Sequence, residues 1–502
     1  MTISYNEYPN EPVILENLSI KFMKQSKFIP IQVYNNIIKI AIVDINDLST
    51  IDTLKQISGM RLEIVEGTEE DIIDAIERLY GSGRQSIETI IEEADKDIYE
   101  LTQGLDDNIE HLKDIASEAP IIRLVNRLIL NAVESGASDI HFEPFDNDFR
   151  VRYRIDGLLN EVESPPKKLQ AAVISRIKIM AKLDIAERRL PQDGRIKLKI
   201  EGKEIDFRVS TLPSIFGESL VMRILDRESL LLDLKQIGFS TNMYEEYIEL
   251  IAKPYGMVLV TGPTGSGKTS TLYTTLSKIN SPEKKIITLE DPVEYQLQGI
   301  NQIQVSVKIG LTFAGGLRAI VRQDPDIILV GEIRDKETAE IAIQSALTGH
   351  LIFSTLHTND AAGSITRLLD MGVENFLLNS TILGILAQRL IRVNCQACKN
   401  KIMPEDRLLK AVGFSKVSGM NFYAGTGCKE CRNTGFKGRI GIFELLKVDE
   451  DIRKLIIEGA SSEKIKESAI NKGMVTLRND GLLKIKNGIT TIPEILRVTL
   501  EI

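Results

Sequence analysis

The chain has 502 residues, which allows about three domains because a single hydrophobic core stops growing at about 250 to 300 residues. Hydrophobic residues make up 43% and charged residues 26%, the balance of an ordinary soluble globular protein. The net charge of -9 argues against nucleic acid as a partner, no apolar run approaches the roughly 18 residues of a membrane-spanning helix, and residues 1–12 lack a signal-peptide core. We therefore expect a cytoplasmic protein with no nucleic-acid partner.

The first 80 residues are predicted to form a small α+β module. Apolar residues alternate with polar ones at 29–33 and 38–42, on either side of Asn35-Asn36, which indicates a β-hairpin with a two-residue turn. The elements expected after it are a helix at 47–57, a strand at 61–65 and a helix opened by Thr68, with Asp71 completing an approximate capping box.

Two further segments precede the centre of the chain. Residues 81–116 begin with Gly81-Ser82-Gly83 and are acidic and poor in large apolar clusters, which indicates a linker. Residues 117–232 are predicted to form a second domain. It opens with an amphipathic helix after Pro120 and continues with strands at 151–155, 196–200 and 205–209 and a turn at Asp156-Gly157.

Residues 233–393 alternate apolar strands with helices, the pattern of a parallel sheet covered on both faces. Within them, an apolar strand and a helix flank a phosphate-binding loop pattern. The expected nucleotide-binding residues are Gly262, Pro263, Thr264, Gly265, Ser266, Gly267, Lys268, Thr269 and Ser270. Glycines let successive N–H groups face one anion, Lys268 reaches the β- and γ-phosphates, and the Thr269 hydroxyl can ligate Mg²⁺. A glycine-rich turn that only joins strand to helix is the alternative.

Two acidic residues stand at the ends of neighbouring apolar strands. Glu290 ends the strand at 286–290, and Glu332 follows the strand at 327–330. Chemistry gathers at such strand ends in open α/β sheets, and ATP hydrolysis needs a carboxylate near Mg²⁺ and a group that positions water. Glu332 suits the metal and Glu290 the water, unless both are solvated strand-end acids. Gly331 stands where an aspartate is usual in such motifs.

Histidines and arginines supply weaker candidates. His350 and His357 bracket the strand at 351–355, where a neutral imidazole could orient the γ-phosphate, although each could equally be a structural residue. An arginine from outside the loop often neutralises charge in the transition state, whereas most arginines only form surface salt bridges. The arginine candidates are Arg208, Arg223, Arg318 and Arg322.

All four cysteines fall in two CxxC pairs, Cys395/Cys398 and Cys428/Cys431. This spacing predicts a closed, structural Zn²⁺ site with four thiolate ligands. Two disulfides are the alternative, which a reducing compartment disfavours. Residues 394–436 are therefore predicted to be a zinc subdomain, and residues 437–502 look mainly helical.

Taken together, these motifs resemble the secretion ATPase superfamily. The resemblance rests on the loop, Leu289-Glu-Asp-Pro-Val-Glu294, Arg322 to Asp335 with Gly331 before Glu332, the two histidines, and Ala137 to Pro144, Arg189 to Arg195 and Arg208 to Pro213. It implies an α/β fold with a RecA-like P-loop domain, a preceding PAS-like α+β domain, a small N-terminal module that binds a partner and a tetracysteine zinc subdomain. It also implies Glu290 as catalytic base, Glu332 as the Walker B acid that supports Mg²⁺, Arg208 and Arg223 at the nucleotide, and His357 at the phosphate.

Within this superfamily, the tetracysteine insert and the N-terminal module are similar to type II secretion assembly ATPases, with pilus-extension ATPases as the alternative. The resemblance implies ATP, Mg²⁺ and Zn²⁺ as cofactors. It implies a homohexamer on the cytoplasmic face of the inner membrane, held by the cytoplasmic domain of a bitopic membrane protein and acting on a polytopic platform protein. A DNA-translocating ATPase and a non-enzymatic binding module remain more distant alternatives.

Overall fold

The computed structural model describes residues 8–9, 13, 22–23, 26–34, 37–45, 47–79, 115–200, 202–226, 233–413 and 421–499. The chain divides into two compact units, Met1–Asp226 and Arg227–Ile502. The predicted linker at 81–116 lies outside the described residues except for its last two positions. No helix in the described ranges combines the length and the apolar character needed to cross a bilayer.

The N-terminal module of the first unit contains a three-stranded sheet in the order β1-β2-β3. Its elements are β1 (Phe28–Tyr34), β2 (Ile37–Ile42), α2 (Leu48–Ser58), β3 (Arg61–Glu66) and α3 (Glu69–Leu79), so each predicted element is present. Tyr34 pairs with Ile37 across the antiparallel β1–β2 ladder, as a two-residue turn requires, and Asn35-Asn36 itself lies outside the described residues. The Thr68 hydroxyl accepts the Asp71 N–H at 3.2 Å and so caps α3.

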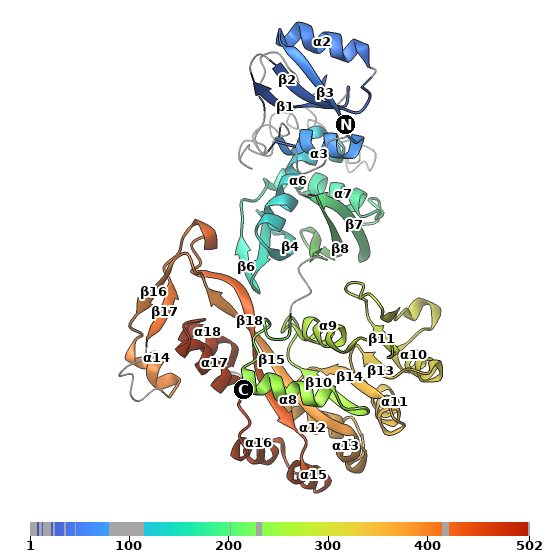
Figure 1. Ribbon diagram of the computed structural model, residues 1–502, viewed down its shortest axis with the longest axis vertical. Coiled ribbons are helices and arrows are strands. Elements are labelled where there is room, and N and C mark those ends of the chain that lie inside the picture. Colours follow the sequence, from blue (N-terminus) through green and yellow to red (C-terminus); the bar gives the residue numbers. More distant parts are fainter. Residues whose placement is uncertain are drawn as a thin grey trace. The chain divides into compact units, whose positions relative to one another are not determined.

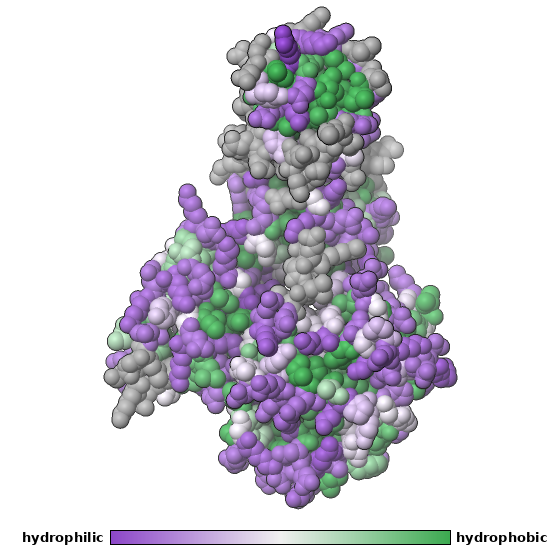
Figure 2. Space-filling model, viewed as in Figure 1, coloured by the Kyte–Doolittle hydropathy of each residue, from purple (hydrophilic) through white to green (hydrophobic). Residues whose placement is uncertain are grey.

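The surface of this module carries apolar side chains. Val33 and Tyr34 at the end of β1, and Ile45 beyond β2, are exposed. Hydrophobic residues gather on the face of the module that Figure 2 shows. Exposed apolar area of this kind is a common feature of protein-binding surfaces.

The remainder of the first unit is a six-stranded antiparallel sheet in the order β6-β5-β4-β9-β8-β7 (Figure 1). Its elements are α6 (Ala119–Glu134), β4 (Ala137–Pro144), β5 (Phe149–Ile155), β6 (Leu158–Glu161), η2 (Lys167–Leu169), α7 (Gln170–Met180), β7 (Gln192–Ile200), β8 (Lys203–Ser214) and β9 (Gly217–Asp226). The predicted turn at Asp156-Gly157 joins β5 to β6, with both residues at positive φ. The apolar stripe of α6 and the inner face of α7 share one core with the sheet.

The second unit is built on a seven-stranded sheet in the order β12-β11-β13-β14-β10-β15-β18. Its first six strands are parallel: β10 (Gly256–Thr261), β11 (Ile286–Glu290), β12 (Asn301–Gln304), β13 (Ile327–Val330), β14 (Leu351–Leu356) and β15 (Ile382–Asn394). The helices of this region are α8 (Thr241–Ile251), α9 (Lys268–Ile279), η4 (Val307–Ile309), α10 (Phe313–Ile320), η5 (Val321–Gln323), α11 (Lys336–Leu347), α12 (Ala361–Asp370) and α13 (Asn375–Thr381). Alternate residues of β10 pack into two different hydrophobic cores. Met257 and Leu259 belong to one core, and Val258 and Val260 belong to the other. The predicted parallel sheet with two covered faces is therefore present.

The C-terminal part differs from expectation at one strand. It contains β16 (Lys399–Ile402), α14 (Asp406–Ala411), β17 (Phe422–Gly425), η6 (Lys429–Cys431), β18 (Phe436–Lys447), α15 (Glu450–Ile457), α16 (Ser462–Asn471), α17 (Leu477–Lys486) and α18 (Ile492–Thr499). The region at 437–502 thus begins with most of β18, which pairs antiparallel with β15 and forms the edge of the main sheet. Buried Glu444 of β18 accepts the N–H groups of Ala361 and Leu477, which ties α12 and α17 to the strand.

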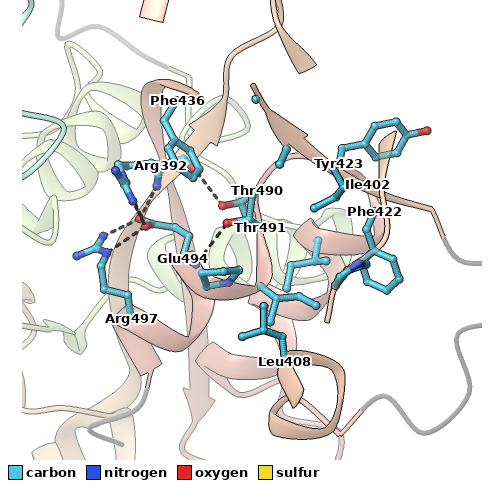
Figure 3. Close-up of a pocket in the computed structure, with 16 residues that line it drawn as sticks. Arg392, Ile402, Leu408, Phe422, Tyr423, Phe436, Thr490, Thr491, Glu494 and Arg497 are labelled. Carbon is cyan, nitrogen blue, oxygen red and sulfur yellow. Dashed lines mark hydrogen bonds and ion pairs between the residues drawn. The ribbon is translucent and has the colours of Figure 1, made fainter. Parts of the chain in front are cut away.

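A pocket of about 360 Å³ lies between the two-stranded β16–β17 sheet and helices α17 and α18 (Figure 3). On its polar side, the buried carboxylate of Glu494 accepts hydrogen bonds from Arg392 and Arg497. Burial raises the pKa of Glu494, but these bonds outweigh it and hold the pKa below its usual value. None of the predicted nucleotide, catalytic or metal residues lines this pocket, so it is separate from the predicted chemistry.

Candidate functional site

The predicted phosphate loop lies between β10 and α9, as a strand–loop–helix unit requires. Gly262 and Gly267 have positive φ, and both positions are crowded by Gln388. A Cβ at Gly262 would lie 2.4 Å from the Gln388 carbonyl oxygen, and one at Gly267 would lie 2.8 Å from its side-chain nitrogen. Only glycine fits these two positions, and the chain then enters α9 at Lys268, whose N-terminal dipole faces the loop.

The Lys268 side chain forms hydrogen bonds within the phosphate loop itself. Its ammonium group donates to the carbonyl oxygens of Gly262 at 2.8 Å and Pro263 at 3.1 Å. Burial lowers the pKa of Lys268 to about 8, while the charge of Glu332 acts in the opposite direction. A phosphate group would offer the lysine a stronger acceptor than two carbonyls, so the loop is poised to exchange internal hydrogen bonds for bonds to an anion.

The side chain of Gln388, on β15, forms hydrogen bonds that hold the phosphate loop. This residue was not predicted from the sequence. Its side-chain nitrogen donates to the Ser266 carbonyl at 2.8 Å, and its oxygen accepts the Thr271 hydroxyl at 2.7 Å. The side chain is 2% exposed. The sequence offered one signal, a single glutamine in the buried apolar run of a strand, because such a residue must find partners for its amide.

Replacing Gln388 by Ala is expected to weaken ATP binding about tenfold, because it removes two buried hydrogen bonds that hold the loop. Titration of the purified chain with a fluorescent ATP analogue measures this change. Gln344→Ala on the exposed side of α11 is the matched control and should leave the affinity unchanged. Equal affinities for the Gln388→Ala chain and the parent would contradict the supporting role.

The structure brings Lys268, Glu332 and His357 together. Glu332 follows β13, forms an ion pair with Arg334, and lies 3.7 Å from the His357 Nε2 atom. Burial and the charge of Lys268 lower the pKa of His357, although Glu332 opposes the shift. This shift favours the neutral imidazole, and the contact with Glu332 is an ion pair only when His357 is protonated. Arg334 was part of the matched motif but was not predicted as a site residue.

Glu290 lies at the same edge of the sheet in a different environment. It ends β11, the neighbour of β13, and is 4% exposed. Its carboxylate accepts hydrogen bonds from the Tyr273 and Thr288 hydroxyls and from Gln302. The solvated alternative is therefore wrong for Glu290, which is buried and accepts hydrogen bonds from three side chains.

His350 and Arg318 take structural positions. The Nδ1 atom of His350 lies 2.8 Å from the Ser345 carbonyl at the end of α11. Arg318 forms an exposed ion pair with Glu337. Exposed ion pairs of this kind contribute little to the stability of the fold. Arg322 lies in η5, exposed.

The predicted arginines Arg208 and Arg223 belong to the first unit, where they lie directly opposite each other on β8 and β9. Arg195 of β7 pairs with Arg208 in turn, so three arginines cross adjacent strands in one row. Asp139 partly balances them, since its carboxylate accepts the Arg223 Nε–H at 3.0 Å. Like charges on directly opposed residues destabilise a sheet unless other groups balance them.

The four cysteines converge on one point. The Sγ–Sγ distances are 3.8 Å for Cys395–Cys428, 3.7 Å for Cys398–Cys431 and 3.7 Å for Cys428–Cys431. Zinc–sulfur bonds of about 2.3 Å in a tetrahedron place the sulfurs about 3.8 Å apart, whereas a disulfide holds them at about 2.05 Å. The thiols are free, so the disulfide alternative is wrong, and the four residues fit a tetrahedral ion.

Hydrogen bonds from nearby backbone N–H groups lower the pKa of one of these thiols, that of Cys431. Burial alone would raise the pKa of Cys431, but the N–H groups of Cys428 and Gly435 donate to its Sγ and lower the pKa to about 6. Burial raises the pKa of Cys398 to about 11. A bound cation would offset the cost of charging that second thiol.

Comparison with known proteins agrees with this geometry. The family model of the Type II/IV secretion system protein matches residues 114–497, and that of the MshEN domain matches residues 2–86. The chain is 52% identical to the type II secretion system protein E of Xanthomonas campestris pv. campestris, over 97% of this chain and 85% of the relative. It is 46% identical to the type IV pilus assembly ATPase PilB of Myxococcus xanthus, over 98% and 88%.

Solved structures show the same fold. The pilus retraction motor PilT with bound ADP aligns with a TM-score of 0.50 at 28% identity and covers 74% of this chain and 96% of PilT. The phosphate loop, the strand-end acids and the tetracysteine cluster all lie within the matched range at 114–497. The chain belongs to the Type II/IV secretion system protein family.

Proposed function

We propose that this protein is a hexameric ATPase whose ATP hydrolysis drives pseudopilus assembly and protein export in a type II secretion system. The observation that carries the proposal is the convergence of Lys268, Glu332 and His357 beside a glycine loop at the N-terminus of α9. The 52% identity to a type II secretion system protein E, over nearly the whole chain, supports the choice of system.

The residues at the loop have distinct roles in this proposal. Residues 262–270 hold the phosphates, and Lys268 neutralises the β- and γ-oxygens. Thr269 and Glu332 would hold Mg²⁺, which draws negative charge from the phosphates when it is bound. Their oxygen atoms are the ligand type that Mg²⁺ prefers, and Glu332 supplies a carboxylate at the end of the strand.

In this proposal, Glu290 and His357 act in the hydrolysis step. A water oxygen attacks the γ-phosphorus, the bond from that phosphorus to the ADP oxygen breaks with its electron pair on ADP, and Glu290 accepts the proton of the water. His357 contacts the γ-phosphate as a neutral imidazole. Arg208 and Arg223 supply positive charge to the nucleotide at a subunit boundary.

Partners and location complete the proposal. The protein acts as a homohexamer in the cytoplasm, peripheral on the inner membrane, and Zn²⁺ bound by Cys395, Cys398, Cys428 and Cys431 holds the 394–436 segment together. The N-terminal module at 1–80 binds the cytoplasmic domain of a bitopic membrane protein, a role that its exposed apolar residues Val33, Tyr34 and Ile45 support. The hexamer acts on a polytopic platform protein of the inner membrane. Nucleic acid is not a substrate.

Genetic complementation tests the choice of system. Expressed in a type II secretion mutant of its own host that lacks this gene, the chain should restore export of secreted enzymes to the medium, and a Lys268→Ala chain should not. A type IV pilus extension ATPase is the second candidate, because the similarity to PilB covers 98% of this chain. Restored surface piliation without restored export would select that alternative.

A further inference from the structure

A cluster of polar side chains encloses Glu290 and has no assigned role. The carboxylate has about four acceptor positions, two on each oxygen. Within the described residues, Oε1 accepts from the Thr288 hydroxyl and from Gln302 Nε2 at 3.3 Å, and Oε2 accepts from the Tyr273 hydroxyl. Three donors from α9, β11 and β12 therefore leave one position, on Oε2.

The donors are themselves fixed in direction. The Tyr273 oxygen accepts the Glu294 N–H at 3.4 Å, so its own proton points at Glu290. The two amide hydrogens of Gln302 are shared among the Tyr295 carbonyl at 3.1 Å, Glu290 Oε1 at 3.3 Å and the Tyr273 oxygen at 3.4 Å. The Gln302 side chain cannot flip, because its oxygen accepts the Leu297 N–H at 2.7 Å. Burial and the nearby Glu290 raise the pKa of Tyr273, which therefore stays a donor at any physiological pH. The ring of Tyr273 also packs edge-to-face on Tyr295 at 4.4 Å.

We propose that Tyr273, Thr288 and Gln302 are positioning residues for ATP hydrolysis, which hold the Glu290 carboxylate in one orientation and leave one Oε2 acceptor site for the attacking water. The inference rests on the proposed role of Glu290. The further claim is that the Glu290 carboxylate is already oriented before nucleotide binds. The hydrogen-bond donors that orient it come from β11, which carries Glu290, from the neighbouring strand β12 and from α9, the helix of the phosphate loop.

A structural role for the cluster makes a different prediction. If the three donors only satisfied a buried carboxylate, removing one would change stability and leave the chemistry intact wherever the protein folds. If they position Glu290, removing one lowers kcat, leaves ATP binding unchanged, and has no effect once Glu290 has lost its basic oxygen. The second outcome depends on coupling between two residues, which a double-mutant cycle isolates.

The experiment compares four full-length chains: the parent, Tyr273→Phe, Glu290→Gln and the double variant. Tyr273→Phe keeps the ring that packs on Tyr295 and removes only the hydroxyl. Its kcat should fall about tenfold or more while the KM for ATP stays within about twofold, since it removes one hydrogen bond to a charged group. The double variant should be no slower than Glu290→Gln alone. Binding of a non-hydrolysable ATP analogue should be equal for all four chains.

Tyr247→Phe is the matched control. Tyr247 is a buried tyrosine whose hydroxyl contacts Thr275 of the same helix α9 at 2.9 Å, and it makes no contact with Glu290 among the described hydrogen bonds. Its removal should leave kcat unchanged. Thr288→Val, which removes a donor to Oε1 and keeps a β-branched side chain in β11, is the second variant should Tyr273→Phe not fold, and the same non-additive result is expected.

The outcomes separate the two proposals. Full kcat in Glu290→Gln would refute the role assigned to Glu290. Loss of activity in Glu290→Gln together with unchanged kcat in Tyr273→Phe and Thr288→Val would overturn the positioning proposal alone. A further loss in the double variant equal to that in Tyr273→Phe, or a raised KM in place of a lowered kcat, would also overturn it.

Discussion

A chain carrying Lys268→Ala is expected to lose ATP hydrolysis by at least about a hundredfold, the largest effect of any single substitution in the loop. Lys268 is the buried cation of the phosphate site, and its ammonium already sits against the loop carbonyls that the phosphates would replace. Alanine leaves the β- and γ-oxygens of the nucleotide without that charge. Release of inorganic phosphate from ATP at saturating Mg²⁺ measures the loss.

The matched control is Lys278→Ala, in the last turn of the same helix and exposed to solvent. It should keep full activity. ATPase activity that persisted in Lys268→Ala would show that the loop assignment is wrong, provided that circular dichroism gives the same helix content for both variants. The affinity of the parent for ATP should also fall as the pH rises past about 8, where Lys268 loses its proton in the unliganded protein.

The second large effect concerns the cysteines. Replacing Cys431 by Ser is expected to abolish zinc binding and to lower the melting temperature by roughly 5 °C or more, because a closed tetrathiolate site contributes its binding energy to folding. The N–H groups of Cys428 and Gly435 donate to the Cys431 sulfur, so this substitution removes one of the four ligands and two hydrogen bonds that orient it. Metal analysis of the purified parent should give one zinc per chain, and a strong chelator should reproduce the destabilisation.

Lys429→Ala provides the control, since Lys429 lies exposed between Cys428 and Cys431 and leaves all four ligands in place. It should retain zinc and the parent's melting temperature. Four titratable thiols and no metal in the native parent would contradict the assignment.

Local signals in the sequence were sufficient for much of the fold. The capping of α3 by Thr68 depends on residues three apart, and the phosphate loop depends on eight consecutive positions, so both could be predicted without tertiary information. The cysteine cluster follows the same logic, because each CxxC pair is a local turn and only the meeting of the two pairs is long-range.

What the sequence did not predict depends on contacts between distant segments. Gln388 meets Ser266 across more than a hundred residues, and Gln302 reaches Glu290 from the next strand. No spacing rule connects such pairs. The pairing of Arg208 with Arg223 could be predicted only in part. The two-residue connection at 215–216 fixes the register of β8 and β9, but only once the hairpin itself is known.

The pairing of β15 with β18 has a consequence for how the protein is made. Residues 395–435 separate the two strands, so a ribosome must complete the cysteine segment before the partner of β15 exists. Until then, one edge of β15 has no hydrogen-bonding partner. Its other edge pairs with β10, the strand that leads into the phosphate loop. A nascent chain halted before residue 436 would carry every loop residue and still expose an unpaired strand edge, which is a template for aggregation.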